Sequence, residues 1–300
     1  MFDWDDLKFL LEVARQGRLG PAARRLRVDV GTVSRRVAEL ERAFGAKLFE
    51  RTAEGFELTP LGRALRPHAE AMEQHALAMA EAGPGRHISG RVRLATMEGI
   101  ASRYLARHLP RLRERHPELL VELITSPALY NLTRREADVS LSFVPVSGPR
   151  LRLRQLGEFS LFLYATPSYL RTHGAPENAA ALRDHVFVDY VEDLVQIREV
   201  QWLRDIIEDP VVVFHSSSMF AQQTAAAAGA GLVLLPSFAG GMDPRLVPVL
   251  KPQVCTTRPI HLACHEDLTD VPRVRTLVEF LAEIVAADSA FLKGGQAEAL

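Results

Sequence analysis

The sequence has few cysteines and tryptophans, and no overall excess of charge. Among its 300 residues are two cysteines and two tryptophans, and the formal net charge is −1. Two cysteines exclude a disulfide scaffold and favour a reducing compartment. The near-zero charge gives no sign of a polyanionic partner for the chain as a whole. With 47% hydrophobic and 24% charged residues, the composition is that of globular proteins, and the length suffices for two or three domains.

Signals for export and for membrane insertion are also missing. The first residues, Met-Phe-Asp-Trp-Asp-Asp, are acidic where a secretory signal peptide is basic. The stretch between His215 and Asp243 has no Asp, Glu, Lys or Arg and is long enough to span a bilayer, but serines, glutamines, glycines and a proline interrupt it. We therefore predict a buried helix, turn and strand there, and a cytoplasmic protein with no membrane segment.

Positive charge is concentrated near the start of the chain. Between Arg15 and Thr52 there are ten Lys and Arg residues but only four Asp and Glu residues. Such a local excess is typical of a nucleic-acid contact, although a solvated charged face gives the same count.

The spacing of apolar residues in this segment predicts three short helices. The first has apolar residues from Leu7 to Ala14 on one face and ends near Gly17, and the second covers residues 22–26. Asp29 is suited to cap the third helix. The inward positions of the third helix, spaced by four, three and four residues, are Val33, Val37, Leu40 and Phe44. Its other faces carry hydroxyls and arginines, which is typical of the recognition helix of a helix-turn-helix.

A β-wing and a long helix are predicted next. Residues 48–49 and 56–58 form two short strands around a turn with Gly55, and a helix follows from 61 to about 82, before a hinge at 83–85. An apolar stripe on this helix suits a partner helix. Such a stripe is more often simple core, but we expect no other surface to bury it and therefore predict dimerisation. The stripe consists of Leu65, Ala69, Met72, Ala76 and Met79.

From Arg91 onward, strands and helices alternate. The predicted strands cover residues 92–95, 120–125, 139–143, 159–165, 211–214, 232–235 and 259–264. The predicted helices cover 100–116, 129–136, a segment that ends at Ala228, and 272–287. This alternation predicts parallel sheets flanked by helices, arranged as two small α/β lobes or as one larger sheet.

These patterns together resemble the LysR-type transcriptional regulators of bacteria over nearly the full length. The motifs that carry the resemblance are Ala22-Ala23-Arg24-Arg25-Leu26, Thr32-Val33-Ser34-Arg35-Arg36, Leu48-Phe49-Glu50-Arg51-Thr52, Leu58-Thr59-Pro60-Leu61-Gly62 and the run from Ala225 to Pro236. The resemblance implies an α/β protein with an N-terminal all-α winged helix-turn-helix and a two-lobed effector domain like the periplasmic binding proteins. The implied boundaries are 1–59 for the DNA-binding domain, 60–89 for the linker (dimerisation) helix and hinge, and 90–300 for the effector domain. Lobe one would cover about 90–163 and 267–290, and lobe two about 164–266.

The candidate DNA contacts lie on the third helix, the second helix and the wing. They are Arg24, Val30, Gly31, Thr32, Ser34, Arg35, Arg36, Arg51 and Thr52. The run Asp29-Val30-Gly31 departs from the polar start that relatives often have, so base recognition is expected from Thr32, Ser34 and Arg35, or from methyl contact with thymine. Arg36 has an alternative role, an ion pair with Glu39 or Glu41 on the same helix.

The candidate effector contacts follow the strands, because open α/β sheets bind ligands beyond the carboxyl ends of their strands. They are Thr96, Met97, Glu98, Thr125, Ser126, Phe143, Val144, Ser216, Ser217 and Ser218. Backbone N–H groups at two of these loops are suited to an anion, although the hydroxyls are equally suited to plain helix caps. Glu98 opposes a carboxylate and favours an amine or hydroxyl. The predicted effector is a small organic acid or an amino-acid-like metabolite, with no cofactor.

Metal and catalytic chemistry have little support in the sequence. His261, Cys264 and His265 lie near Cys255, but strand alternation places Cys264 and His261 on opposite faces, and His265 lies about 13 Å from His261. No metal site is predicted, and inert cysteines are favoured over a Cys255–Cys264 redox switch. The sequence has no nucleophile elbow, P-loop or zinc-protease motif, so no enzyme is predicted.

The predicted function is regulation of transcription. A homodimer or homotetramer would bind a dyad-symmetric promoter site, and a small metabolite bound between the lobes would modulate that binding. The alternative is a small-molecule-binding or catalytic α/β protein whose basic N-terminal bundle serves only for oligomerisation. Phosphate contacts would make DNA binding steeply dependent on salt, which separates the two hypotheses.

Overall fold

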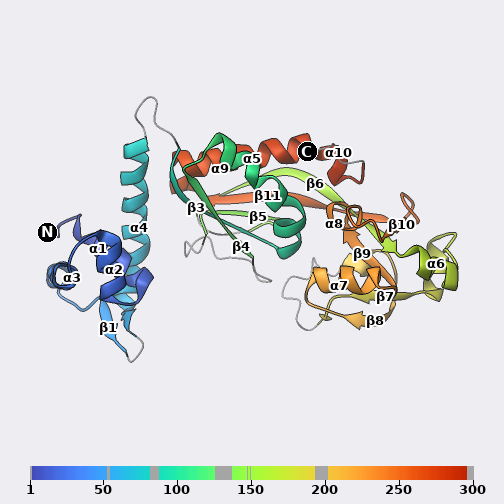
Figure 1. The fold of residues 1–300 in the computed structure, drawn as a ribbon, viewed down its shortest axis with the longest axis horizontal. Helices are drawn as coiled ribbons and strands as arrows, with labels where there is room; N and C mark the ends of the chain where they lie inside the picture. The colour runs from blue at the N-terminus through green and yellow to red at the C-terminus, as the bar shows by residue number, and fades with distance from the viewer. Residues whose placement is uncertain are drawn as a thin grey trace. The chain divides into compact units, whose positions relative to one another are not determined.

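The computed structural model of the chain describes residues 2–52, 55–81, 88–125, 137–146, 148, 150–192 and 202–295. The chain divides into two compact units, Met1–Arg86 and His87–Leu300, whose elements are labelled in Figure 1. Each unit has a hydrophobic core of its own, one made by residues between Leu7 and Ala69 and the other by residues between Val92 and Leu292. The two units are therefore considered separately.

Helices and one small hairpin build the N-terminal unit. They are α1 (Asp6–Gln16), α2 (Leu19–Leu26), α3 (Val30–Phe44), β1 (Phe49–Arg51), β2 (Phe56–Leu58) and α4 (Pro60–Glu81). Gly17 and Gly45 end α1 and α3 in the left-handed conformation, with φ of 65° and 68°. Asp29 caps α3, because its Oδ1 accepts a hydrogen bond of 2.8 Å from the backbone N–H of Thr32. The predicted winged helix-turn-helix is confirmed.

The wing is attached to the end of α1. The backbone N–H of Phe56 donates to the carbonyl of Gly17 at 2.7 Å. A Cβ at Gly55 would lie only 2.2 Å from the same carbonyl oxygen, so this close approach requires glycine. Thr59 then starts α4, since its hydroxyl accepts from the N–H of Gly62 at 3.1 Å.

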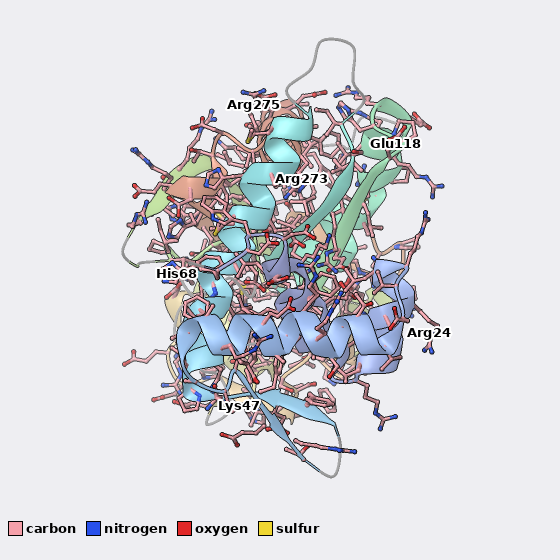
Figure 2. All side chains as sticks on the ribbon, turned by 90° about the vertical axis from the view of Figure 1, so that its left-hand side faces the viewer. Arg24, Lys47, His68, Glu118, Arg273 and Arg275 are labelled. Atoms are coloured by element: carbon pink, nitrogen blue, oxygen red, sulfur yellow. The ribbon has the colours of Figure 1, made fainter. Side chains whose placement is uncertain are left out.

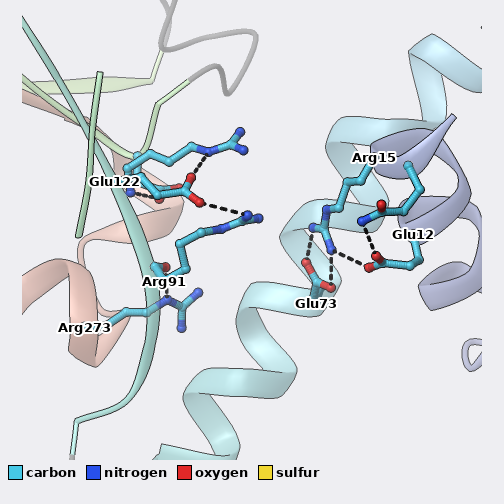
Figure 3. A network of polar contacts seen from close by, with 9 residues as sticks. Glu12, Arg15, Glu73, Arg91, Glu122 and Arg273 are labelled. Carbon is cyan, nitrogen blue, oxygen red and sulfur yellow. Dashed lines mark hydrogen bonds and ion pairs between the residues drawn. The ribbon is translucent and has the colours of Figure 1, made fainter. Parts of the chain in front are cut away.

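The predicted seam on α4 is divided into a buried and an exposed part. Ala69 is 2% exposed and belongs to the core of the helical unit, and Leu65 and Met72 pack against that core. Arg15 of α1 forms an ion pair of 2.5 Å with Glu73 of α4 (Figure 3). The expectation that no other surface buries the stripe is therefore wrong for its first half, because Leu65, Ala69 and Met72 pack into the core that α4 shares with α1. The second half is exposed at Ala76 and Met79.

The second unit is built on one continuous mixed sheet. The strand order is β4-β3-β5-β11-β6-β9-β7-β8, and β10 also pairs with β6. The strands are β3 (Gly90–Thr96), β4 (Leu119–Thr125), β5 (Val139–Ser142), β6 (Leu151–Ala165), β7 (Val186–Asp189), β8 (Val211–His215), β9 (Leu232–Pro236), β10 (Val247–Val249) and β11 (Cys255–His265). Strands β7 and β10 are not among those predicted.

Two lobes share this sheet, as the family resemblance implied. β3 pairs in parallel with β4 and β5 in one lobe, and β7 pairs in parallel with β8 and β9 in the other. The strands β6 and β11 run antiparallel to each other through both lobes (Figure 1), with an irregularity between Ile260 and His261. The predicted parallel pairing is therefore present within each lobe, and the long antiparallel strands β6 and β11 cross between the lobes and join them.

Helices flank the sheet. They are η1 (Ile100–Tyr104), η2 (Leu105–Arg107), α5 (Leu109–Arg115), α6 (Pro167–His173), η4 (Ala179–Asp184), η7 (Trp202–Asp205), α7 (Met219–Ala227), α8 (Ser237–Gly240), η8 (Glu266–Leu268), α9 (Pro272–Ala287) and α10 (Ser289–Leu292). The single helix predicted over 100–116 is wrong, because this segment changes from a π turn to a 3-10 turn before α5 begins, next to Pro110. The helix predicted over 129–136 lies outside the described residues.

The uncharged stretch between His215 and Asp243 forms α7, β9 and α8. The predicted helix, turn and strand are present: the strand β9 is fully buried, whereas only Met219, Gln222, Gln223 and Ala226 of the helix α7 are buried. No helix in the described parts of the chain is long and apolar enough to cross a membrane.

Candidate functional site

The outward face of α3 presents several of the predicted DNA contacts. Val30, at the first position of the helix, is 47% exposed, and Gly31, Ser34 and Arg35 are exposed as well. Val33 and Leu40 of the same helix are fully buried in the core. Within the described residues, Arg35 has no hydrogen-bond or ion-pair partner. Its guanidinium is therefore available to a ligand.

Two other candidates on α3 are bound within the chain. The Thr32 hydroxyl donates to Asp29 Oδ2 at 2.6 Å, and this bond helps to hold the pKa of the Asp29 carboxyl below its usual value. Arg36 Nη1 lies 3.0 Å from Asp6 Oδ1 and 3.3 Å from Asp3 Oδ2. The alternative that Arg36 pairs with Glu39 or Glu41 is therefore wrong about the partners.

Glu41 instead joins α3 to the wing. It accepts hydrogen bonds from the backbone N–H groups of Leu48 and Phe49, at 2.9 and 3.3 Å, and from Lys47 Nζ at 2.6 Å. This carboxylate therefore holds the start of β1 against the recognition helix.

The remaining basic candidates lie on the wing and on α2. Arg51 and Thr52 are exposed at the end of β1, and the Thr52 backbone N–H donates to the carbonyl of Gly55 at 2.8 Å. Arg24 is exposed on α2 and lies at the periphery of the unit (Figure 2). These positions are suited to phosphate contacts beside the recognition helix.

In the second unit, the loops after β3, β4 and β5 contain the candidates of lobe one. Thr96, the last residue of β3, is 4% exposed, and its hydroxyl has no hydrogen-bond partner in the part of the chain that the structure describes. Met97 is half-buried, and Thr125 is exposed at the end of β4. Phe143 and Val144 are buried, with the Phe143 ring 5.4 Å from that of Trp202. Ser126 lies outside the described residues.

The serines of lobe two stabilise the start of α7. Ser218 Oγ accepts from the backbone N–H of Ala221 at 3.4 Å, and Ser216 Oγ accepts from that of Ser218 at 3.2 Å. Ser217 is exposed. The alternative role of plain caps therefore describes the structure at Ser216 and Ser218.

Two predicted residues, one from each lobe, contact each other where the lobes meet. Both carboxylate oxygens of Glu98 lie 3.3 Å from the hydroxyl of Ser218. Beside this contact, a Cβ on Gly99 would lie 2.7 Å from Met219 Sδ, and the Arg103 guanidinium stacks on the Phe220 ring at 4.5 Å. The loop after β3 therefore packs against the first turn of α7, and a ligand that enters here must alter this contact.

The sequence reasoning missed a second group at the same place. Asp189 ends β7, and the backbone carbonyl of the next residue, Tyr190, bonds His215 Nδ1 at 2.9 Å. Burial raises the pKa of the Asp189 carboxyl, and burial together with the nearby Glu98 raises the pKa of the Tyr190 hydroxyl. The run Val186-Phe187-Val188-Asp189, apolar and closed by an acid, was the signal for this strand.

The cysteines and histidines of the candidate metal cluster are not assembled into a site. Among the described residues, no group of three His, Cys, Asp or Glu side chains is placed to hold a metal ion. Cys255 is exposed, Cys264 is buried, and both are free. Burial raises the pKa of the Cys264 thiol, which keeps it protonated.

A winged helix-turn-helix followed by a two-lobed α/β unit defines a class of one-chain DNA-binding regulators. Comparison with protein families agrees. The model of the LysR substrate binding domain matches residues 85–286, and that of the bacterial regulatory helix-turn-helix proteins of the lysR family matches residues 4–63. The chain belongs to the LysR family of transcriptional regulators.

Known proteins resemble the chain over nearly its whole length. The transcriptional regulator CrgA of Neisseria meningitidis serogroup C is 26% identical over 288 residues, which cover 93% of this chain and 96% of CrgA. The Mau operon transcriptional activator of Paracoccus denitrificans is 28% identical over 95% of this chain and 97% of that protein.

Solved structures share the fold. A full-length OxyR variant from Pseudomonas aeruginosa superposes with a TM-score of 0.73 at 19% identity, covering 100% of this chain and 99% of that one. Full-length CbnR in complex with its target DNA superposes with a TM-score of 0.59 at 20% identity, covering 94% and 100%.

Proposed function

We propose that this chain regulates transcription by binding a specific promoter site through α3 and the wing. The observation that carries the proposal is the exposed face of α3, where Arg35, Ser34 and Val30 project from a helix whose opposite face is fully buried. Family membership supports it, and so does the likeness to CbnR, which has been solved with its target DNA. The proposal implies a cytoplasmic protein, because bacterial promoters lie in the cytoplasm. No catalytic activity is proposed.

The test is DNA binding by the purified full-length protein across a salt series. Duplexes from the region upstream of its own gene, and duplexes selected by the protein from a random pool, would be compared with scrambled duplexes by fluorescence anisotropy. Tight binding to the native or selected duplex, with a steep loss of affinity as salt rises, is expected. Failure to bind any duplex at low salt would contradict the proposal and favour a metabolite-binding or catalytic α/β protein.

We further propose that the protein binds as a homodimer or homotetramer to a dyad-symmetric site. The second half of α4 supports this, because Met79 is 79% exposed and Ala76 is exposed on the same helix. Small and flexible apolar side chains at this spacing suit a partner helix. Sedimentation of the free protein tests the proposal, and a monomer at micromolar concentration would contradict it.

An effector at the junction of the lobes completes the proposed function. The carboxylates of Glu98 and Asp189 come from opposite lobes. The nearby Arg103 guanidinium is stacked on the Phe220 ring, and the loops that carry the two carboxylates include no Lys or Arg. This charge favours a ligand with amine or hydroxyl donors over a simple carboxylate. The effector proposed is therefore amino-acid-like or polyhydroxylic rather than a plain organic acid.

Thermal shift of the full-length protein with small amines, polyols and carboxylates tests the effector class. Amines or polyols are expected to raise the melting temperature of the wild type, and Glu98→Gln is expected to reduce the shift given by amines more than that given by polyols. Glu279→Gln, on an exposed position of α9, is the matched control. Stabilisation by carboxylates alone would contradict this effector class.

A further inference from the structure

Two adjacent arginines on α3, Arg35 and Arg36, have different surroundings. Consecutive residues of a helix point about 100° apart, so the two guanidinium groups cannot occupy the same place. Arg35 is exposed, whereas the Arg36 side chain is 30% exposed and is directed at the start of α1. From the sequence alone, both arginines are candidate DNA contacts.

Arg36 is held by two carboxylates and one aromatic ring. Nη1 lies 3.0 Å from Oδ1 of Asp6, whose side chain is only 4% exposed, and 3.3 Å from Oδ2 of Asp3. The guanidinium carbon lies 5.9 Å from the centre of the Phe9 ring. Two acids and a ring therefore hold this cation within its own domain, and its Nη1 group already has two carboxylate partners.

The same acids are tied into the start of α1. Oδ1 of Asp3 accepts from the backbone N–H of Asp5 at 3.0 Å, and the backbone carbonyl of Asp3 accepts from the N–H of Asp6 at 3.1 Å. Phe2 adds an apolar link, because its ring lies 5.2 Å from that of Phe44 at the far end of α3. The first residues of the chain therefore hold α3 at two points along its length.

From these contacts we infer that Arg36 is a positioning residue, which with Asp3 and Asp6 fixes the orientation of the recognition helix on α1 while the neighbouring Arg35 contacts DNA. Orientation matters because side chains on α3 must meet base edges and phosphates at fixed positions in the groove. Releasing Arg36 from its acids therefore weakens DNA binding, even when the release removes a negative charge from the protein.

This inference rests on the proposed DNA-binding function. For Asp3→Asn, it predicts a change in DNA affinity opposite to the change expected if Arg36 contacted DNA directly. If Arg36 contacted phosphate, Asp3→Asn would free it and remove a negative charge, and the affinity for DNA would rise. If Arg36 positions the helix, Asp3→Asn lowers the affinity. Asp3 is more than half exposed, so the substitution does not threaten the fold.

The experiment measures anisotropy with the full-length protein and a duplex that the wild type selects from a random pool, across a salt series. Failure of the wild type to select or bind any duplex would be a failure of the proposed function, and it is distinguished at this first step. The variants are Asp3→Asn, Arg36→Gln, their double mutant, and Arg35→Gln, with Asp5→Asn as the matched control on an acid that does not contact Arg36.

For Asp3→Asn and Arg36→Gln we expect an affinity loss of about two- to fivefold, an unchanged salt slope, and a double mutant no weaker than Arg36→Gln alone. For Arg35→Gln we expect the plot of log affinity against log salt concentration to become less steep by about 0.9, the value for one lost phosphate contact. Three results would overturn the inference. One is a gain in affinity for Asp3→Asn, another is a salt slope for Arg36→Gln that is less steep by the same amount, and the third is unchanged affinity in both variants.

Discussion

At the scale of single residues, the surroundings of a side chain decide whether a polar group is available for function. Thr32 and Ser34 are both hydroxyls on α3, but the Thr32 hydroxyl is bound to Asp29 at 2.6 Å whereas Ser34 is exposed. Thr32 therefore contributes to helix capping, and we propose that Ser34, Arg35 and the methyl groups of Val30 recognise the bases.

Asp243 gives a prediction at the same scale. It is buried, and its carboxylate accepts bonds of 2.9 and 2.7 Å from Arg245 and of 3.0 Å from Gln223. The bonds from Arg245 and Gln223 hold the pKa of the Asp243 carboxyl at about 2, below its usual value of 3.8. Because the folded pKa is the lower one, this carboxylate stabilises the fold above about pH 4, and the contribution is lost as the pH falls toward 2.

We expect Asp243→Asn to lower the free energy of unfolding by about 2 kcal/mol at neutral pH. The difference from the wild type should shrink as the pH falls through this range. Urea denaturation of the full chain, followed by circular dichroism at several pH values, measures both effects. Asp270→Asn, on an exposed carboxylate, serves as the control. A difference that stays constant with pH would show that the ionised form of Asp243 is not the stabilising one.

At the scale of elements, α4 combines two roles that its sequence does not separate. Its apolar stripe is regular, but the first half packs on the core of the helical unit and the second half is exposed. The division arises because α1 covers only part of the length of α4, and Arg15 and Glu73 form an ion pair between the two helices (Figure 3).

Enlarging alanines on α4 tests this division. Ala69→Leu places extra volume in a filled core, so we expect a loss of about 1–3 kcal/mol in the stability of the helical unit. Ala76→Leu lies on the exposed part, so the same substitution should leave thermal unfolding nearly unchanged and alter only self-association. Circular dichroism melts and sedimentation of the two variants give the comparison. Equal destabilisation by both would contradict the division.

At the scale of the whole molecule, the chain consists of two units with separate cores. The apolar residues of the first core end at Met72, and those of the second core begin at Ile88. Since hydrophobic burial is the main stabilising term of folding, each unit is expected to keep its fold without the other.

We therefore expect a fragment of residues 88–300 to unfold in urea at the same midpoint as the corresponding transition of the full chain. In the full chain, Asp243→Asn should move only this transition, and Ala69→Leu only the other. Tryptophan fluorescence reports the second unit, because Trp202 is 3% exposed there whereas Trp4 of the first unit is 70% exposed, and far-UV circular dichroism reports both units. A single transition that both variants move together would contradict independent folding.

Much of the architecture could be predicted from local patterns. Helix α9 has the predicted bounds, and Asp29 and Gly17 limit helices where expected, because capping and helical periodicity depend on neighbours in sequence. The strands β7 and β10 were missed because segments of four and three residues are too short to establish a period. The segment 100–116 is not one helix because the backbone passes through a π turn and a 3-10 turn before α5 begins next to Pro110, a break that apolar spacing does not reveal.

The candidate sites follow the same distinction. The polar loops could be predicted because they follow predicted strands, and the helix with the outward arginines could be predicted from its apolar spacing. In the folded chain Arg36 pairs with Asp3 and Asp6, Glu98 meets Ser218, and Tyr190, the residue after β7, has a pKa raised by burial and by the nearby charge of Glu98. These contacts join residues from 30 to 120 positions apart, and folding brings them together through core packing, which local periodicity does not specify.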